Sequence, residues 1–329
     1  MAAAVATPAT PTDPGRRIAL PRGLLTYVAR RALYGLMTLV LVVSTVFLII
    51  RVLPSDPART LAGENAPPER VAQIREELRL DEPILTQYLD YLGGLLRGDI
   101  GRSALNGRPV AEVVGERIPD TLMLALLAVV IGAAAGGFLG VRAARLPGRW
   151  VDRALSVATG AGVAIPAFWL GLLLIKFLAV DHQVFPASGQ QGPLAIVLPA
   201  LTLAVYVFAV VGKIVRSAMI EVLHEDFVRT ALAKGCSPSR AVWRHGARNC
   251  SLSVLTVIGL QLGALLGGSV IVEATFSWPG LGSLVTDAIT NQDLAVVQGG
   301  VLCFAFLFVL VNLLVDVTYG LLDPRIEHS

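Results

Sequence analysis

Six apolar runs, each long enough to cross a lipid bilayer, constrain the fold of this 329-residue chain more than any other feature. A hydrocarbon core of about 30 Å needs about 20 apolar residues in a helix. Backbone polar groups must pair within the segment in lipid, so each run is expected to be helical. The runs are 32–50, 121–141, 157–180, 194–212, 252–272 and 294–315. With 54% hydrophobic and 16% charged residues, the sequence predicts an all-α integral membrane protein with six transmembrane helices.

The positions of Lys and Arg predict the orientation of these helices. Basic residues gather in the N-terminal tail, in the connection between the second and third runs, and around Gly235. The connections 181–193 and 274–293 contain none. Cytoplasmic connections of membrane proteins carry the excess of Lys and Arg. Both termini and the region around Gly235 are therefore expected in the cytoplasm.

This orientation divides the chain into segments. Residues 1–22 are rich in Ala, Pro and Thr and are expected to form a disordered cytoplasmic tail. Residues 23–118 hold the first transmembrane helix and an external helical subdomain. Residues 119–320 form the main transmembrane domain, which includes a cytoplasmic hairpin at 217–250. Residues 321–329 are a cytoplasmic C-terminal tail.

The external subdomain is expected to contain two helices and a turn. Pro67-Pro68 opens an amphipathic helix with Val71, Ile74 and Leu78 on one face. A second helix is indicated by the spacing of Ile84, Leu85, Tyr88, Leu89 and Leu92. Gly98-Asp99-Ile100-Gly101 is typical of a turn.

Two runs carry ladders of glycine at four-residue spacing. Residues four apart share one face of a helix, and glycine lets a second backbone approach closely, which drives helix association in lipid. Both helices are expected to pack against protein along these faces, within this subunit or with a partner. The ladders are Gly132, Gly136 and Gly140 in the second run, and Gly259, Gly263 and Gly267 in the fifth.

Few ionisable side chains lie near the runs, as expected from the free energy of placing charge in lipid. Lys176, Lys213 and Glu273 lie near predicted helix ends and are expected to extend to the interface. Asp316 is expected to pair with a basic residue of a neighbouring helix. Pro166 and Pro199 could kink the third and fourth helices.

The sequence lacks the motifs of several catalytic classes. Gly212-Lys213 stands outside any Gly-x-x-x-x-Gly-Lys-[Ser/Thr] loop, and no Gly-x-Ser-x-Gly elbow occurs. His224-Glu225 begins like a zincin helix, but Val228 stands where the second histidine would be. Cys236, Cys250 and Cys303 show no paired spacing. The sequence therefore predicts no enzymatic activity, no metal site and no disulfide.

The hairpin around Gly235 reads as a helix, a tight stop and a second helix. Glu225 and Arg229 are spaced as an i,i+4 ion pair, and Gly235 can adopt the left-handed conformation that ends a helix. Ser237 can cap a new helix that begins at Pro238. The segment is expected to be a rigid projection on the cytoplasmic side.

The sequence Arg-Thr-Ala-x-Ala-Lys-Gly at 229–235 resembles the cytoplasmic "EAA" loop of type I ABC importer permeases, specifically that of the oligopeptide/dipeptide/nickel permease family. Four further stretches resemble the same family in the same order. They are Leu53-Pro54-Ser55-Asp56-Pro57, the external pattern from Leu80-Asp81-Glu82-Pro83 to Gly98-Asp99-Ile100-Gly101-Arg102-Ser103, the outer loop Phe276-Ser277-Trp278-Pro279-Gly280-Leu281-Gly282, and Asn312 to Arg325 at the C-terminal end.

The resemblance implies a type I permease fold in the bacterial inner membrane and a set of partners. These are a second homologous permease subunit, two ATPase subunits that bind ATP and Mg, an extracytoplasmic substrate-binding protein and the lipid bilayer. This chain itself is expected to hold no cofactor. The implied ATPase-coupling residues are Glu225, Asp226, Phe227, Arg229, Thr230, Ala231, Lys234 and Gly235, and the outer-loop residues near the binding protein are Trp278, Pro279, Gly280 and Gly282.

Two other interpretations compete with this one. A self-sufficient secondary transporter or channel usually shows internal repeats and mid-membrane charges, and neither is evident in the sequence. A DNA-binding helix-turn-helix is disfavoured because the hairpin lies between two apolar runs, so no nucleic-acid partner is expected. The sequence also departs from the general EAA pattern at Arg229 and Thr230.

Overall fold

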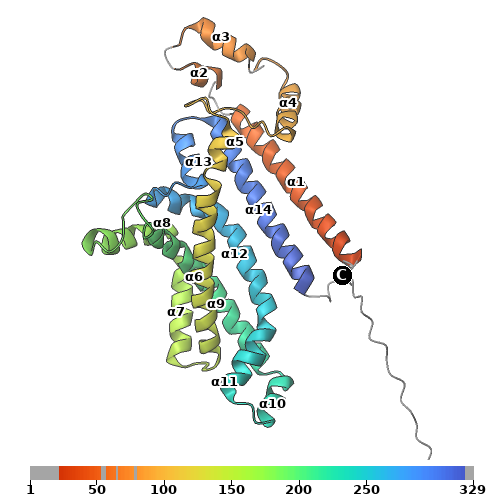
Figure 1. Ribbon diagram of the computed structural model, residues 1–329, viewed down its shortest axis with the longest axis vertical. Helices are drawn as coiled ribbons and strands as arrows, with labels where there is room; N and C mark the ends of the chain where they lie inside the picture. Colours follow the sequence, from red (N-terminus) through yellow and green to blue (C-terminus); the bar gives the residue numbers. More distant parts are fainter. Residues whose placement is uncertain (1–21, 53–56, 64–65, 78–79, 323–329) are drawn as a thin grey trace, which may run out of the picture.

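The computed structural model describes residues 22–52, 57–63, 66–77 and 80–322, and most of them are helical (Figure 1). The predicted tails and the Leu53-Pro54-Ser55-Asp56 motif lie almost entirely outside these residues. Among these described residues, five unbroken helices are long and apolar enough to cross a membrane. They are α1 (Arg22–Val52), α6 (Ile118–Ala144), α9 (Val197–Leu223), α12 (Ala247–Phe276) and α14 (Leu294–Leu322).

The third predicted span is broken rather than straight. Helix α7 (Trp150–Ala164) and the segment formed by α8 (Ala167–Leu174) and the π-helical turn η1 (Ile175–Asp181) meet at an angle of 104°. Pro166 lies in the break, and the residue before a proline is forced into an extended conformation, which Ile165 adopts with ψ 123°. Counting this pair as one span gives the six that the sequence predicts.

Pro199 behaves differently from Pro166. It is the third residue of α9, in the first turn, where a missing N–H removes no helical hydrogen bond. The fourth span is therefore unbroken, and the kink considered for it at Pro199 is wrong.

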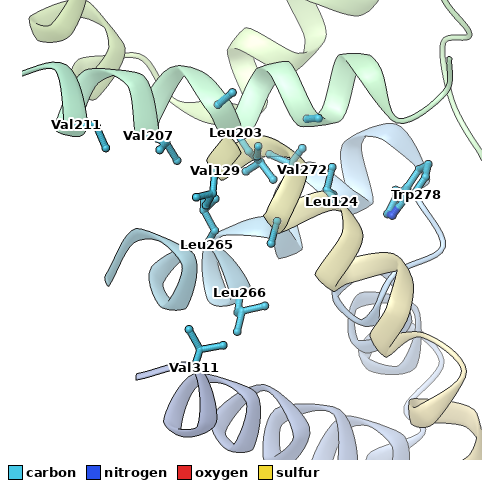
Figure 2. Packing of buried hydrophobic residues seen from close by; sticks show 14 of the residues in the cluster. Leu124, Val129, Leu203, Val207, Val211, Leu265, Leu266, Val272, Trp278 and Val311 are labelled. Carbon is cyan, nitrogen blue, oxygen red and sulfur yellow. The ribbon is translucent and has the colours of Figure 1, made fainter. Parts of the chain in front are cut away.

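Helices α6 and α9 pack backbone to backbone along the first glycine ladder. A Cβ atom on Gly132, Gly136 or Gly140 would lie only 2.6, 2.8 or 2.9 Å from a backbone oxygen of α9. Leu203 and Val207 of α9 continue this contact beside Val129 of α6 (Figure 2). Because a side chain would not fit, the ladder holds these two spans together as one unit.

The second ladder contacts α14 over only part of its length. A Cβ atom on Gly259 would meet Val315 at 2.3 Å, and one on Gly263 would meet the Asn312 amide at 3.1 Å. Gly267 has no atom within 4 Å of that position in the described part of the chain. Gly259 and Gly263 are therefore packed against α14, and Gly267 lies on an open surface of α12.

Two ion pairs connect spans near the ends of the bundle. Asp316 accepts from Arg31 of α1 at 3.2 Å and from the Tyr27 hydroxyl at 3.4 Å, so the predicted pairing of Asp316 is confirmed. Buried Asp152 of α7 accepts two bonds from Arg216 of α9, one of them 2.9 Å long, and a third from the backbone of Gly148 at 2.8 Å. Helix α7 is thereby attached to α9.

The external segment contains the helices α2 (Pro57–Ala62), α3 (Pro68–Glu77), α4 (Ile84–Leu96) and α5 (Val110–Gly115). The segment lies at one end of the bundle, with α2, α3 and α4 beyond it and α5 beside α14 (Figure 1). Tyr88 of α4 touches Phe47 of α1, with ring centroids 5.3 Å apart, and its hydroxyl lies 2.6 Å from that of Ser44. Two predicted helices and the turn at Gly98 and Gly101, both with positive φ, are confirmed.

Candidate functional site

The hairpin projects from the end of the bundle opposite the external segment (Figure 1). Helix α9 ends at Leu223, α10 (Asp226–Ala233) follows, and α11 (Pro238–Arg240) and the π-helical turn η2 (Ala241–Gly246) lead into α12. Both arms of the hairpin therefore continue into membrane-spanning helices.

Local backbone chemistry fixes the turn between the arms. The Cys236 N–H donates to the Ala231 carbonyl at 3.1 Å, and the Gly235 N–H donates to the Leu232 carbonyl at 3.0 Å. This pair of bonds is the Schellman motif, which requires a left-handed residue where Gly235 has φ +83°. The Ser237 hydroxyl caps α11 by accepting from the Arg240 N–H at 3.4 Å. The predicted stop and restart at these residues are confirmed.

One face of α10 is attached and the other is open. Val228 is 2% exposed and holds the helix against the bundle, and Leu232, one turn further on, lies on the same face, whereas the side chains of Phe227 and Arg229 are exposed on the other. Arg229 contacts Asp226 at 3.5 Å, so the predicted partner, Glu225, is wrong. The extended Glu225 precedes the helix, which turns its side chain away from the i+4 position.

The remaining predicted hairpin residues lie on or near the open face. The Thr230 hydroxyl is used within α10, where it donates to the Asp226 carbonyl at 2.9 Å. Lys234 is exposed beside the turn, and Ala231 is half-buried. The hairpin thus presents mixed charge, exposed Phe227 and Leu232, and a small residue close to its tip.

A cavity of about 460 Å³ lies between the hairpin and the ends of α6 and α9. Its apolar lining includes Val228 and Leu232 of α10, and its charged lining consists of Arg142 and Arg145. The hairpin therefore leaves a hollow between itself and the bundle.

The outer loop, residues 276–282, surrounds a buried carboxylate at the opposite end of the bundle. Glu273 of α12 is 0% exposed, so the expectation that it extends to the interface is wrong. Its carboxylate accepts bonds from the hydroxyls of Thr121 and Ser269 at 2.9 and 3.0 Å, and from the Gly282 and Ser283 N–H groups at 2.6 and 3.3 Å. A buried charge is tolerated when donors satisfy it in this way.

The four predicted outer-loop residues form this anchor. Trp278 is 2% exposed, and its indole N–H donates to the Asp120 carbonyl at 3.2 Å. The Pro279 carbonyl accepts from Arg117 at 3.2 Å. A Cβ atom on Gly280 or Gly282 would collide with the Glu273 carboxylate, which explains glycine at both positions.

Two polar contacts at this end were not anticipated from the sequence. One is the pair of hydrogen bonds that Thr121 and Ser269 donate to Glu273. The sequence signal for it is that Ser269 and Glu273 lie four residues apart in α12. The other is a buried bond of 2.5 Å from the Ser103 hydroxyl to Asp293, which ties the external segment to the start of α14. The residues that form each contact are not adjacent in sequence, so hydropathy alone does not reveal either contact.

Within the part of the chain that the structure describes, no three His, Cys, Asp or Glu side chains are placed to hold a metal ion. The arrangement instead consists of an exposed helical projection at one end, an anchored loop at the other, and apolar helices between them.

Comparison with known proteins identifies the family. Residues 136–328 match the family described as "Binding-protein-dependent transport system inner membrane component", and residues 24–125 match the N-terminal family of such membrane components. The glutathione transport system permease proteins GsiC of Salmonella typhi and Escherichia coli (strain K12) are each 40% identical over 306 residues, which cover 93% of this chain and 100% of theirs.

Two solved structures share the fold at low sequence identity. The MetNI methionine ABC transporter in an inward-facing conformation aligns with a TM-score of 0.56 and 17% identity, covering 64% of this chain and 96% of that one. An amino acid ABC transporter with histidines gives a TM-score of 0.51 and 18% identity, covering 65% and 94%. The type I importer fold expected from the sequence is therefore present, and the chain belongs to the binding-protein-dependent inner membrane component family as a permease subunit of an ABC importer.

Proposed function

We propose that this permease subunit imports peptides or related small solutes and is driven by two ATPase subunits that bind the hairpin. The solute would come from an extracytoplasmic binding protein, and a second homologous permease subunit would complete the path. We include glutathione among these solutes because the relatives at 40% identity are named for its transport. ATP and Mg would be bound by the ATPases and not by this chain.

The observation that carries this proposal is the open face of α10 on a fixed turn. Phe227 exposes apolar surface beside Asp226 and Arg229, a combination suited to a groove in another protein. The Schellman bonds of Gly235 hold this face in one orientation. A rigid projection can transmit the motion of a docked partner, whereas a flexible loop would absorb it.

The packing behind the hairpin supports the transmission of motion. The glycine ladder locks α9 to α6, and the pair of Arg216 with Asp152 locks α9 to α7. Movement of the hairpin would therefore carry three helices as one body, as in domain rotation of the hinge type.

The test is co-purification followed by transport in proteoliposomes. The complex of both permease subunits and the ATPases should import peptide only with ATP. Replacing Phe227 by serine should release the ATPases, while Leu105→Ser, at an exposed leucine of the external segment, should not. Retention of the ATPases by the Phe227→Ser variant would overturn the proposed coupling role.

A further inference from the structure

A cavity of about 300 Å³ lies where the third span breaks. It is bounded by Gly162 and Ile165 at the break, by Tyr206 of α9, and by Ala264 and Gly268 of α12. Helix α7 has 15 residues and is about 22 Å long, shorter than a hydrocarbon core of about 30 Å. The break and its cavity therefore lie within the membrane.

The backbone at the break is polar. Pro166 has no N–H, so the carbonyl of Gly162 has no helical donor at that position. Irregular backbone at membrane depth is tolerated where it is buried in protein or lines a water-filled cavity. Gly162 lines the cavity, so its carbonyl is an acceptor at this depth that lacks a helical donor.

The exposed side chains of α9 lie on one face and are all polar. They are Tyr206, Lys213, Ser217 and Glu221, whose spacings of seven, four and four residues keep them on one side of a helix. A face turned to lipid would be apolar, because ionisable side chains in spans face a protein interior or water. This face, which begins at the cavity, is suited to an aqueous path.

Two groups on this face are free to bind a solute. Tyr206 is 42% exposed, and among the described residues its hydroxyl makes no hydrogen bond. Lys213 is exposed and makes no ion pair in the part of the chain that the structure covers. The two residues are seven positions apart, about 10 Å along the axis, which is the length of about three extended residues.

We propose that this face of α9 binds a short peptide during its passage, with Tyr206 on a backbone amide and Lys213 on the free carboxylate. A phenol can both donate to and accept from an amide, and an ammonium group binds a carboxylate by a charge-assisted hydrogen bond. This inference rests on the proposed import of peptides. It adds that the solute is recognised in the transmembrane path, through its C-terminal carboxylate, and not only by the binding protein.

The test compares each solute with its amide in the reconstituted transporter. Trialanine and glutathione are compared with the same peptides amidated at the C-terminal carboxylate. Lys213→Gln should lower uptake of the free acids about tenfold and leave the amides almost unchanged, because a bond to a charged group is lost. Lys213→Arg should keep the wild-type ratio, and Tyr206→Phe should lower uptake of acid and amide alike.

Lys176→Gln is the matched control, because Lys176 is an exposed lysine of the same chain that pairs with Asp181 at 3.1 Å. It should leave the ratio of acid to amide uptake unchanged. Equal loss of acid and amide uptake in Lys213→Gln would overturn the inference while leaving the proposed function standing. Failure of the wild-type complex to import either peptide with ATP would instead overturn the proposed function, and the inference with it.

A second measurement tests the inference if the Lys213→Gln variant fails to assemble into the complex. Ser217→Cys, which keeps Lys213 and lies one turn from it on the same face, in a chain whose three native cysteines are serine, should react with a membrane-impermeant methanethiosulfonate, and trialanine should slow this reaction. Absence of labelling, or labelling that trialanine leaves unchanged, would contradict the assignment.

Discussion

The hydroxyl of Thr121 on α6 donates a 2.9 Å hydrogen bond to the carboxylate of Glu273 on α12, joining two spans that are 152 residues apart in sequence. The same hydroxyl accepts from the Leu281 N–H at 2.8 Å. Thr121 and Glu273 together therefore fix the outer loop to both helices. The loop is expected to move with these spans.

Replacing Thr121 with valine should destabilise the protein by about 1–3 kcal/mol, because the buried Leu281 N–H loses its acceptor and the Glu273 carboxylate loses a donor. Thermal unfolding of the detergent-solubilised chain measures the change. Thr275→Val is the control, since the exposed Thr275 hydroxyl bonds only to the Ile271 carbonyl of its own helix. Equal shifts in melting temperature for the two variants would contradict the anchor.

Replacing Gly136 with alanine should separate α6 from α9. The added Cβ would lie 2.8 Å from the Phe208 carbonyl oxygen, and overpacking of this kind costs about 1–3 kcal/mol. Adjacent Gly137 has no atom within 4 Å of its Cβ position among the described residues, so Gly137→Ala is the matched control. Unfolding midpoints of the two variants should differ, with only Gly136→Ala lowered.

Replacing Gly235 with valine should abolish ATP-driven uptake while membrane insertion is retained. A β-branched residue at φ +83° is strained by about 1–3 kcal/mol, and this strain opens the turn without touching a span. Uptake and membrane content are measured together. Gly235→Asn, which tolerates the left-handed conformation better, should keep part of the activity. Normal uptake by the valine variant would argue against a fixed hairpin.

Replacing Arg216 with methionine should be strongly destabilising, by about 3–5 kcal/mol, because it leaves the buried Asp152 carboxylate without its cation. Adding Asp152→Leu should restore much of the loss, since the uncompensated charge is then removed. Asp316→Asn provides the contrast, because Arg31 and Asp316 form a more exposed pair worth about 0–1 kcal/mol. Unfolding in denaturant can rank the variants.

The sequence alone determined the features that depend on neighbouring residues. Runs of apolar residues decide which segments are spans, and the order Ala231, Gly235, Ser237 and Pro238 specifies the hairpin stop and restart. These are local properties, because hydropathy and helix capping act within one or two turns. Pro166 likewise indicated a kink in the third span.

Only the tertiary structure decided how distant side chains combine. The position of Glu273 near a predicted helix end predicts that its side chain lies at the membrane interface. The packing of α6 and the outer loop instead surrounds it with four hydrogen-bond donors. The 104° bend and the polar face of α9 likewise depend on which helices lie alongside. A side chain's partners are set by residues over a hundred positions away, so local patterns leave them undetermined.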